Sequence, residues 1–166
     1  MFAHSLSRSL AVAVPLLVLV ACNPFRREGA VQMSADDAAL NTRWHANVAS
    51  PSALAGVVQM NGAASMAPSA TGPGTVVTLD LANAAPGGLH PWEMRLGQCG
   101  TTPDGGPFGA GSLYEPLEVG SDGRATATTT LPIATPQSGR YYVVVRASQA
   151  NATTVVACGN LAPPTR

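Results

Sequence analysis

The chain has 166 residues, of which only 11% are charged, and its formal net charge is zero. This length suffices for one domain with a hydrophobic core, and the charge balance excludes the basic surface of a nucleic-acid-binding protein. The 17 glycines and 14 prolines favour short strands and tight turns over long helices, so we expect an all-β fold.

Residues 1–21 have the pattern of an export signal. Arg8 gives the amino-terminal end a positive charge, and an uncharged, almost wholly aliphatic run extends from Leu10 to Val20. This run is shorter than the roughly 20 apolar residues that a membrane-spanning helix needs. It leads into Leu-Val-Ala-Cys at residues 19–22, which resembles the bacterial lipobox. We therefore predict a lipoprotein signal peptide and a lipid on Cys22; the alternatives are an ordinary signal peptide or an uncleaved anchor.

A lipid on Cys22 predicts attachment to a membrane of the bacterial cell envelope, on its periplasmic side. Several acyl chains on one residue hold a protein stably, whereas a single chain is marginal. Asn23 follows the cysteine, in place of the aspartate that favours retention in the inner membrane of enteric bacteria. The outer membrane is therefore favoured over the inner membrane.

Residues 22–51 are predicted to form the lipidated terminus, a tether and a short docking segment. Within them, residues 34–40 are predicted to form a short helix with Asp36 and Asp37 in its first turn, where acidic side chains are favourable. The folded domain itself is predicted over residues 52–166.

From Ser52 onward, alternating residues and turns rich in glycine and proline predict strands. The alternation is clearest in residues 75–82, where Val77, Leu79 and Leu81 share one face. Further strands are predicted at residues 89–96, 117–119, 124–130, 140–147 and 153–157, with a hairpin turn at 121–123 and an irregular loop at 100–112. Seven or eight short strands of this kind indicate a sandwich or a flattened barrel.

Two cysteines, Cys99 and Cys158, remain once Cys22 is assigned to the lipid. Export places both in an oxidising compartment, where such a pair usually forms a disulfide. A disulfide that closes a loop of this length stabilises a protein by about 4 kcal/mol in the chain-entropy model. The alternative is a pair of free, buried thiols.

Several stretches, taken in order, resemble copper–zinc superoxide dismutase. They are Gly-Leu-His-Pro-Trp-Glu-Met-Arg at residues 88–95, the Asp-Gly turn at 122–123, Tyr-Tyr-Val-Val-Val-Arg at 141–146 and Ala-Cys-Gly at 157–159. The resemblance covers roughly residues 52–161. It implies an eight-stranded Greek-key β-barrel whose intrasubunit disulfide corresponds to Cys99 and Cys158.

The residues that bind copper in that family are replaced in this chain. The His-X-His pair falls on Glu93 and Arg95, and the copper ligand at the end of the valine-rich strand falls on Arg146. Copper that cycles between two oxidation states requires several imidazoles, and arginine cannot deprotonate to bind a metal. We therefore expect no copper at these positions and no catalytic residues of the dismutase type.

The zinc ligands and the bridging histidine are also missing. In the family they lie in the loop after the His-X-His strand, and here the corresponding residues 100–112 hold no histidine and a single carboxylate, Asp104. The resemblance implies a structural role for the one retained histidine, His90, which would tie backbone segments together. We therefore expect neither zinc nor copper as a cofactor.

Glu93 and Arg95 are two residues apart, so they share one face of a strand. In the implied fold Arg146 lies beside them on a neighbouring strand. We hypothesise that Glu93 accepts hydrogen bonds from one or both arginines, so that a guanidinium group replaces the copper ion. The alternative is three ordinary surface charges that interact weakly.

These residues together predict an envelope-anchored, dismutase-like lipoprotein with a binding or structural role and no catalytic activity. Its partners would be the membrane, through Cys22, and an unknown protein or small anion near Arg95 and Arg146 or near the loop 100–112. The first alternative is a superoxide dismutase with atypical metal ligands. The second is an immunoglobulin-like adhesion module, whose disulfide would join two facing sheets around a buried tryptophan.

Overall fold

The computed structural model describes residues 42–101 and 105–165, and all their regular elements are strands or single turns of 3-10 helix. The predicted signal peptide, the lipidation site Cys22, the helix at 34–40 and Asp104 lie outside these residues. The strands are β1 (Trp44–Ala49), β2 (Asn61–Pro68), β3 (Thr75–Ala82), β4 (Leu89–His90), β5 (Trp92–Leu96), β6 (Leu117–Glu118), β7 (Ala125–Leu131), β8 (Tyr141–Arg146) and β9 (Val155–Asn160). The 3-10 turns are Ser52–Leu54 and Gly111–Leu113. No helix among the described residues is long and apolar enough to cross a membrane.

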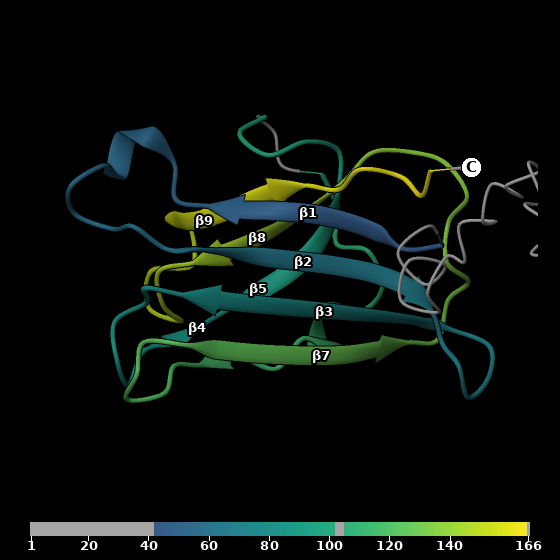
Figure 1. Cartoon of the computed structure of the whole chain (residues 1–166), viewed down its shortest axis with the longest axis horizontal. Coiled ribbons are helices and arrows are strands. Elements are labelled where there is room, and N and C mark those ends of the chain that lie inside the picture. Colours follow the sequence, from purple (N-terminus) through teal and green to yellow (C-terminus); the bar gives the residue numbers. More distant parts are fainter. Residues whose placement is uncertain (1–41, 102–104, 166) are drawn as a thin grey trace, which may run out of the picture. The chain divides into compact units, whose positions relative to one another are not determined.

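Seven of the described strands form one antiparallel sheet in the order β5-β8-β9-β1-β2-β3-β7, and this sheet curls into a half-barrel (Figure 1). The two remaining described strands, β4 and β6, pair with each other. The prediction of an all-β fold is therefore confirmed. The strand count differs from the eight expected, and part of the difference arises at one proline.

Pro91 divides the strand that was predicted at residues 89–96 into β4 and β5. A proline has no N–H to donate to a neighbouring strand, so a ladder of hydrogen bonds is interrupted at that position. β4 pairs with β6, whereas β5 pairs with β8. One continuous segment of chain thus contacts two different partners on either side of Pro91.

β1 precedes the boundary at Ser52 that was predicted from the sequence. Its residues pair with β2 from Trp44 to Ala49, and Ala49 also pairs with Cys158 of β9. Trp44, Ala46 and Val48 are buried, and the residues between them are exposed. The sheet therefore includes residues that the sequence assigned to the segment 22–51, because a strand with small or polar residues at half its positions gives a weak pattern.

The hydrophobic core lies against one face of the sheet. Val77, Leu79 and Leu81 of β3 all point into it, as their alternation predicted. The ring of Trp44 packs edge-on against Tyr141 with centroids 5.3 Å apart, and its indole N–H donates to the carbonyl of Pro136 at 2.9 Å. The first strand is thereby fixed to the loop that precedes β8.

The predicted turn at residues 121–123 is present, but the strands on either side of it do not form a hairpin ladder. Gly123 has a φ of 73°, a left-handed conformation that glycine adopts readily, and the amide of Arg124 donates to Asp122 Oδ1 at 3.1 Å. β6 pairs with β4, and β7 pairs with β3. β6 is short because Pro116 directly precedes it.

Candidate functional site

The neighbouring strands β5 and β8 position the residues of the candidate site. In their antiparallel register Glu93 lies opposite Val144 and Arg95 lies opposite Tyr142. Trp92 and Met94 alternate with them and are buried in the core. Glu93 and Arg95 therefore occupy the face of the sheet that is turned away from the core, together with every second residue of β8.

Glu93, Arg95 and Arg146 form a cluster of ion pairs on this outer face. Arg95 Nη1 donates a hydrogen bond to Glu93 Oε1, and Arg146 Nη2 lies 3.9 Å from the same oxygen. The three side chains are only 13–20% exposed. The structure thus brings the hypothesised residues together as ion pairs, with the hydrogen bond coming from Arg95 and a longer electrostatic contact from Arg146.

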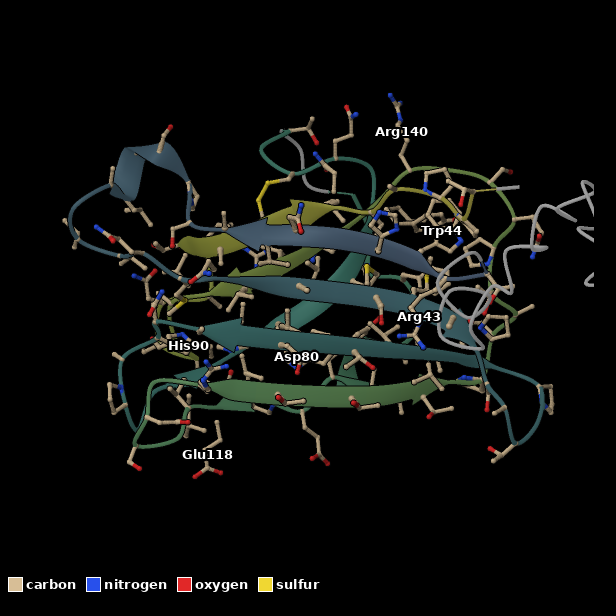
Figure 2. All side chains as sticks on the ribbon, in the orientation of Figure 1. Arg43, Trp44, Asp80, His90, Glu118 and Arg140 are labelled. Atoms are coloured by element: carbon tan, nitrogen blue, oxygen red, sulfur yellow. A yellow bond between two sulfur atoms is a disulfide. The ribbon has the colours of Figure 1, made fainter. Side chains whose placement is uncertain are left out.

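The backbone around Arg146 is held on both sides by the segment that contains Pro91. The amide of Arg146 donates to the carbonyl of Pro91 at 2.8 Å, and the carbonyl of Arg146 lies 3.0 Å from Nδ1 of the buried His90. The pairing of β8 with β9 also shifts register between Val145 and Arg146, an irregularity that re-aims a side chain at the end of a strand. His90 (Figure 2) thus makes the kind of backbone tie that the resemblance implies.

Gly88 leaves the space that the ring of His90 occupies. A Cβ atom added at Gly88 would lie 2.8 Å from His90 Nε2 and 3.0 Å from the carbonyl oxygen of Ala85. A larger residue at Gly88 would therefore displace the imidazole that contacts the end of β8.

Tyr114 lies beneath the ion pairs and is buried. Its hydroxyl donates to the carbonyl of Phe108 at 2.6 Å, and its ring packs edge-on against Trp92 with centroids 5.1 Å apart. Burial is the largest cause that raises the pKa of Tyr114 well above its ordinary value, and the nearby negative charge of Glu93 acts in the same direction. The phenol is therefore neutral over the physiological pH range.

A disulfide joins Cys99, in the loop after β5, to Cys158 of β9, which confirms the predicted pairing. The amide of Cys99 donates to Oδ1 of Asn160 at 2.8 Å, so the loop is attached to β9 at two points. Cys158 lies opposite Val144 in the β8–β9 register. The bridge therefore crosses the same outer face that carries the ion pairs.

A groove with a cavity volume of about 670 Å³ lies beside the disulfide, and we call it the disulfide groove. Its walls include residues 49–51 and 99–101, and Tyr142, Val144 and Arg146 of β8 also line it. Arg146 is the only charged residue in its lining. A second hollow, of about 240 Å³, is lined by Glu93, Tyr114 and Arg146 among others. Arg146 thus borders both spaces, whereas Glu93 borders only the smaller one.

Sequence reasoning identified the three charged residues and missed the groove. It pointed to the loop 100–112 and to Arg95 as contact sites, but Arg95 does not line the disulfide groove. One signal was available in the run Tyr-Tyr-Val-Val-Val at residues 141–145, because a strand that is apolar on both faces is covered on both faces.

Copper and zinc do not fit the residues at this site. Two of the three positions that the resemblance assigns to copper hold arginines, which cannot bind a metal, and the carboxylate of Glu93 already accepts a hydrogen bond from Arg95. Among residues 42–101 and 105–165, no group of three or more histidine, cysteine, aspartate or glutamate side chains is placed to hold a metal ion. The donor set suits an ion-pair cluster and not a redox metal.

The comparisons with known proteins identify no family for this chain. A scan against protein-family models found no match, and a search of curated proteins also found none.

Proposed function

We propose that this chain is a non-catalytic binding module with a fold like that of copper–zinc superoxide dismutase. The observation that carries the proposal is the cluster of Glu93, Arg95 and Arg146. These are the positions that the resemblance assigns to copper ligands, and they meet on one face of two neighbouring strands. In place of a metal they hold two guanidinium groups around one carboxylate.

The arrangement of the strands supports the dismutase-like barrel. If β4 and β5 are taken as one strand that bends at Pro91, the nine described strands become eight. That bent strand pairs with β8 through β5 and with β6 through β4, so it extends from the edge of the half-barrel toward β6. A barrel would be completed between β6 and β7, which the turn at residues 121–123 joins.

The position of the disulfide supports this fold over an immunoglobulin-like module. An immunoglobulin bridge joins strands of two facing sheets around a buried tryptophan. Here the bridge joins the loop after β5 to β9, and its sequence separation is 59 residues. Trp44 and Trp92 are buried in the core, whereas Cys158 belongs to a separate apolar cluster with Tyr142 and Val144.

The location proposed for the module is the periplasmic side of the cell envelope, with the outer membrane favoured. Cys22 carries the lipid in this proposal, and residues 23–41 connect it to β1. The cluster has two cations and one carboxylate, so its formal charge favours an anionic partner. The module would thus present a weakly cationic site at the membrane surface.

The deciding experiment measures metal content and superoxide turnover on the mature chain, made without its signal peptide and lipid and supplied with copper and zinc. We expect no stoichiometric metal and no turnover, because the former ligand positions hold ion-paired arginines. An active copper–zinc superoxide dismutase treated in the same way is the control. Stoichiometric copper with turnover would overturn the proposal and would show that this chain is a dismutase with atypical ligands.

A further inference from the structure

The disulfide groove has the composition of a small-molecule site. Pockets that bind small ligands have volumes of roughly 300–1,000 Å³ and are lined mainly by apolar side chains with a few polar groups. The volume of about 670 Å³ lies within this range. Tyr142 and Val144 are each no more than 2% exposed and form an apolar surface beside the disulfide.

The charge of the groove is asymmetric. Arg146 lines it, whereas neither Arg95 nor Glu93 does. A ligand in the groove therefore meets the guanidinium group of Arg146 without meeting the carboxylate of Glu93 in the lining. The carboxylate is shared between two arginines, and its hydrogen bond comes from Arg95, which leaves the cluster with a net positive charge.

The backbone at Arg146 is suited to holding a ligand in one orientation. Its amide and carbonyl contact Pro91 and His90, so the base of the side chain is fixed before any ligand arrives. A guanidinium group presents paired donors that match the two oxygens of a carboxylate. Fixing a recognition group in advance reduces the entropy that binding would otherwise lose.

We propose that the disulfide groove binds a small amphipathic carboxylate. Its anionic group contacts Arg146, and its apolar body lies against Tyr142, Val144 and the disulfide. This inference rests on the proposed function, because it assumes that Arg146 serves binding and not metal chemistry. It goes further by naming the ligand class and the particular surface that receives it.

The first test uses calorimetric titration of the unlipidated mature chain with decanoate, below the concentration at which decanoate forms micelles. We expect saturable binding of one decanoate per chain. Acetate, which lacks the apolar body, and decanol, which lacks the charge, should each bind at least about tenfold more weakly. Equal binding of decanol would overturn the proposal, because the groove would then be only an apolar surface.

The second test separates the roles of two arginines. Arg146→Gln should weaken decanoate binding at least about tenfold, because it removes the only charge in the groove. Arg140→Gln is the matched control, because Arg140 is exposed and lies away from His90 and the end of β8 (Figure 2). Circular dichroism would establish that both variants fold. Equal affinity of the two variants for decanoate would overturn the assignment of Arg146.

A third variant tests the groove without altering any charge. Thr153 is exposed and lines the groove, so Thr153→Trp should fill part of it and abolish decanoate binding. Thr128→Trp places the same side chain on the exposed face of β7, outside the groove, and should leave binding unchanged. Unchanged binding in Thr153→Trp would overturn the location. Failure of all decanoate binding in a metal-free, inactive protein would remove this inference and leave the proposed function intact.

Discussion

Arg146 makes contacts through its amide, its carbonyl and its side chain, and each contact reaches a residue between positions 90 and 93. The amide donates to Pro91, the carbonyl contacts His90 and the guanidinium group pairs with Glu93. This concentration of contacts explains why the end of β8 is so closely defined. A substitution at any one of these positions would therefore be felt at the others.

The carboxylate of Glu93 keeps two guanidinium groups together, and its removal should destabilise the fold. We expect Glu93→Gln to lower the free energy of unfolding by about 2 kcal/mol, between the values for exposed and buried pairs, because the side chains are largely covered. Urea denaturation would measure the loss. Glu118→Gln is the control, because Glu118 (Figure 2) is exposed, and it should change stability by less than about 0.5 kcal/mol.

A double-mutant cycle would show whether the loss comes from the ion pair itself. Once Glu93 is replaced, Arg95→Gln should cost less than it does in the unmodified protein, since its partner is already absent. Strictly additive effects of Glu93→Gln and Arg95→Gln would contradict the coupling that the hydrogen bond between these residues implies.

Tyr114 makes the stability of the protein depend on alkaline pH. Its folded-state pKa is raised, mainly by burial, while in the unfolded chain the phenol ionises near its ordinary pKa of about 10. Below that pH the full stability is present. Above it the unfolded state loses a proton that the folded state retains, so the free energy of unfolding should fall as pH rises.

The contribution of Tyr114 can be measured by urea denaturation at about pH 8 and about pH 11. Tyr114→Phe should reduce the alkaline loss of stability and should cost about 1 kcal/mol at the lower pH, because the hydrogen bond to Phe108 is removed. An alkaline loss of the same size in both proteins would show that other groups cause it.

Among the elements, the loop after β5 depends on the disulfide for its attachment to β9. Replacing both cysteines, as Cys99→Ser and Cys158→Ser together, should lower the free energy of unfolding by about 4 kcal/mol, given the sequence separation of 59 residues. The amide of Cys99 would retain only its hydrogen bond to Asn160. Chemical denaturation of the double variant beside the oxidised protein would measure the loss, and equal stability would contradict it.

The sequence predicted the elements whose patterns are local and strong. Residues 75–82 alternate throughout and form β3 at those bounds. β1 was missed because only Trp44 and Val48 are large among its buried residues. The division at Pro91 depends on which strands lie on either side of it, and a single segment of sequence does not contain that information. The disulfide groove was not predicted for the same reason, since its walls come from residues far apart in the chain.

At the scale of the whole molecule, the proposed attachment to the membrane depends on a single residue. Cys22→Ser should move the protein from the membrane fraction to the soluble periplasmic fraction, because no other lipid site is proposed. Fractionation followed by immunoblotting would measure the distribution. The variant with Cys99 and Cys158 both replaced is the control and should stay with the membrane. Membrane retention of Cys22→Ser would contradict the lipid anchor.

β8 has a further consequence for how this protein fails when it is heated. Its residues 141–145 form an uncharged apolar run, and the folded protein pairs β8 with β5 on one side and β9 on the other. Such a run joins readily to copies of itself once it is released from its neighbours. Thermal unfolding at high concentration should therefore end in aggregation through this segment, and the disulfide that holds the β5–β9 region together delays that outcome by keeping the run covered.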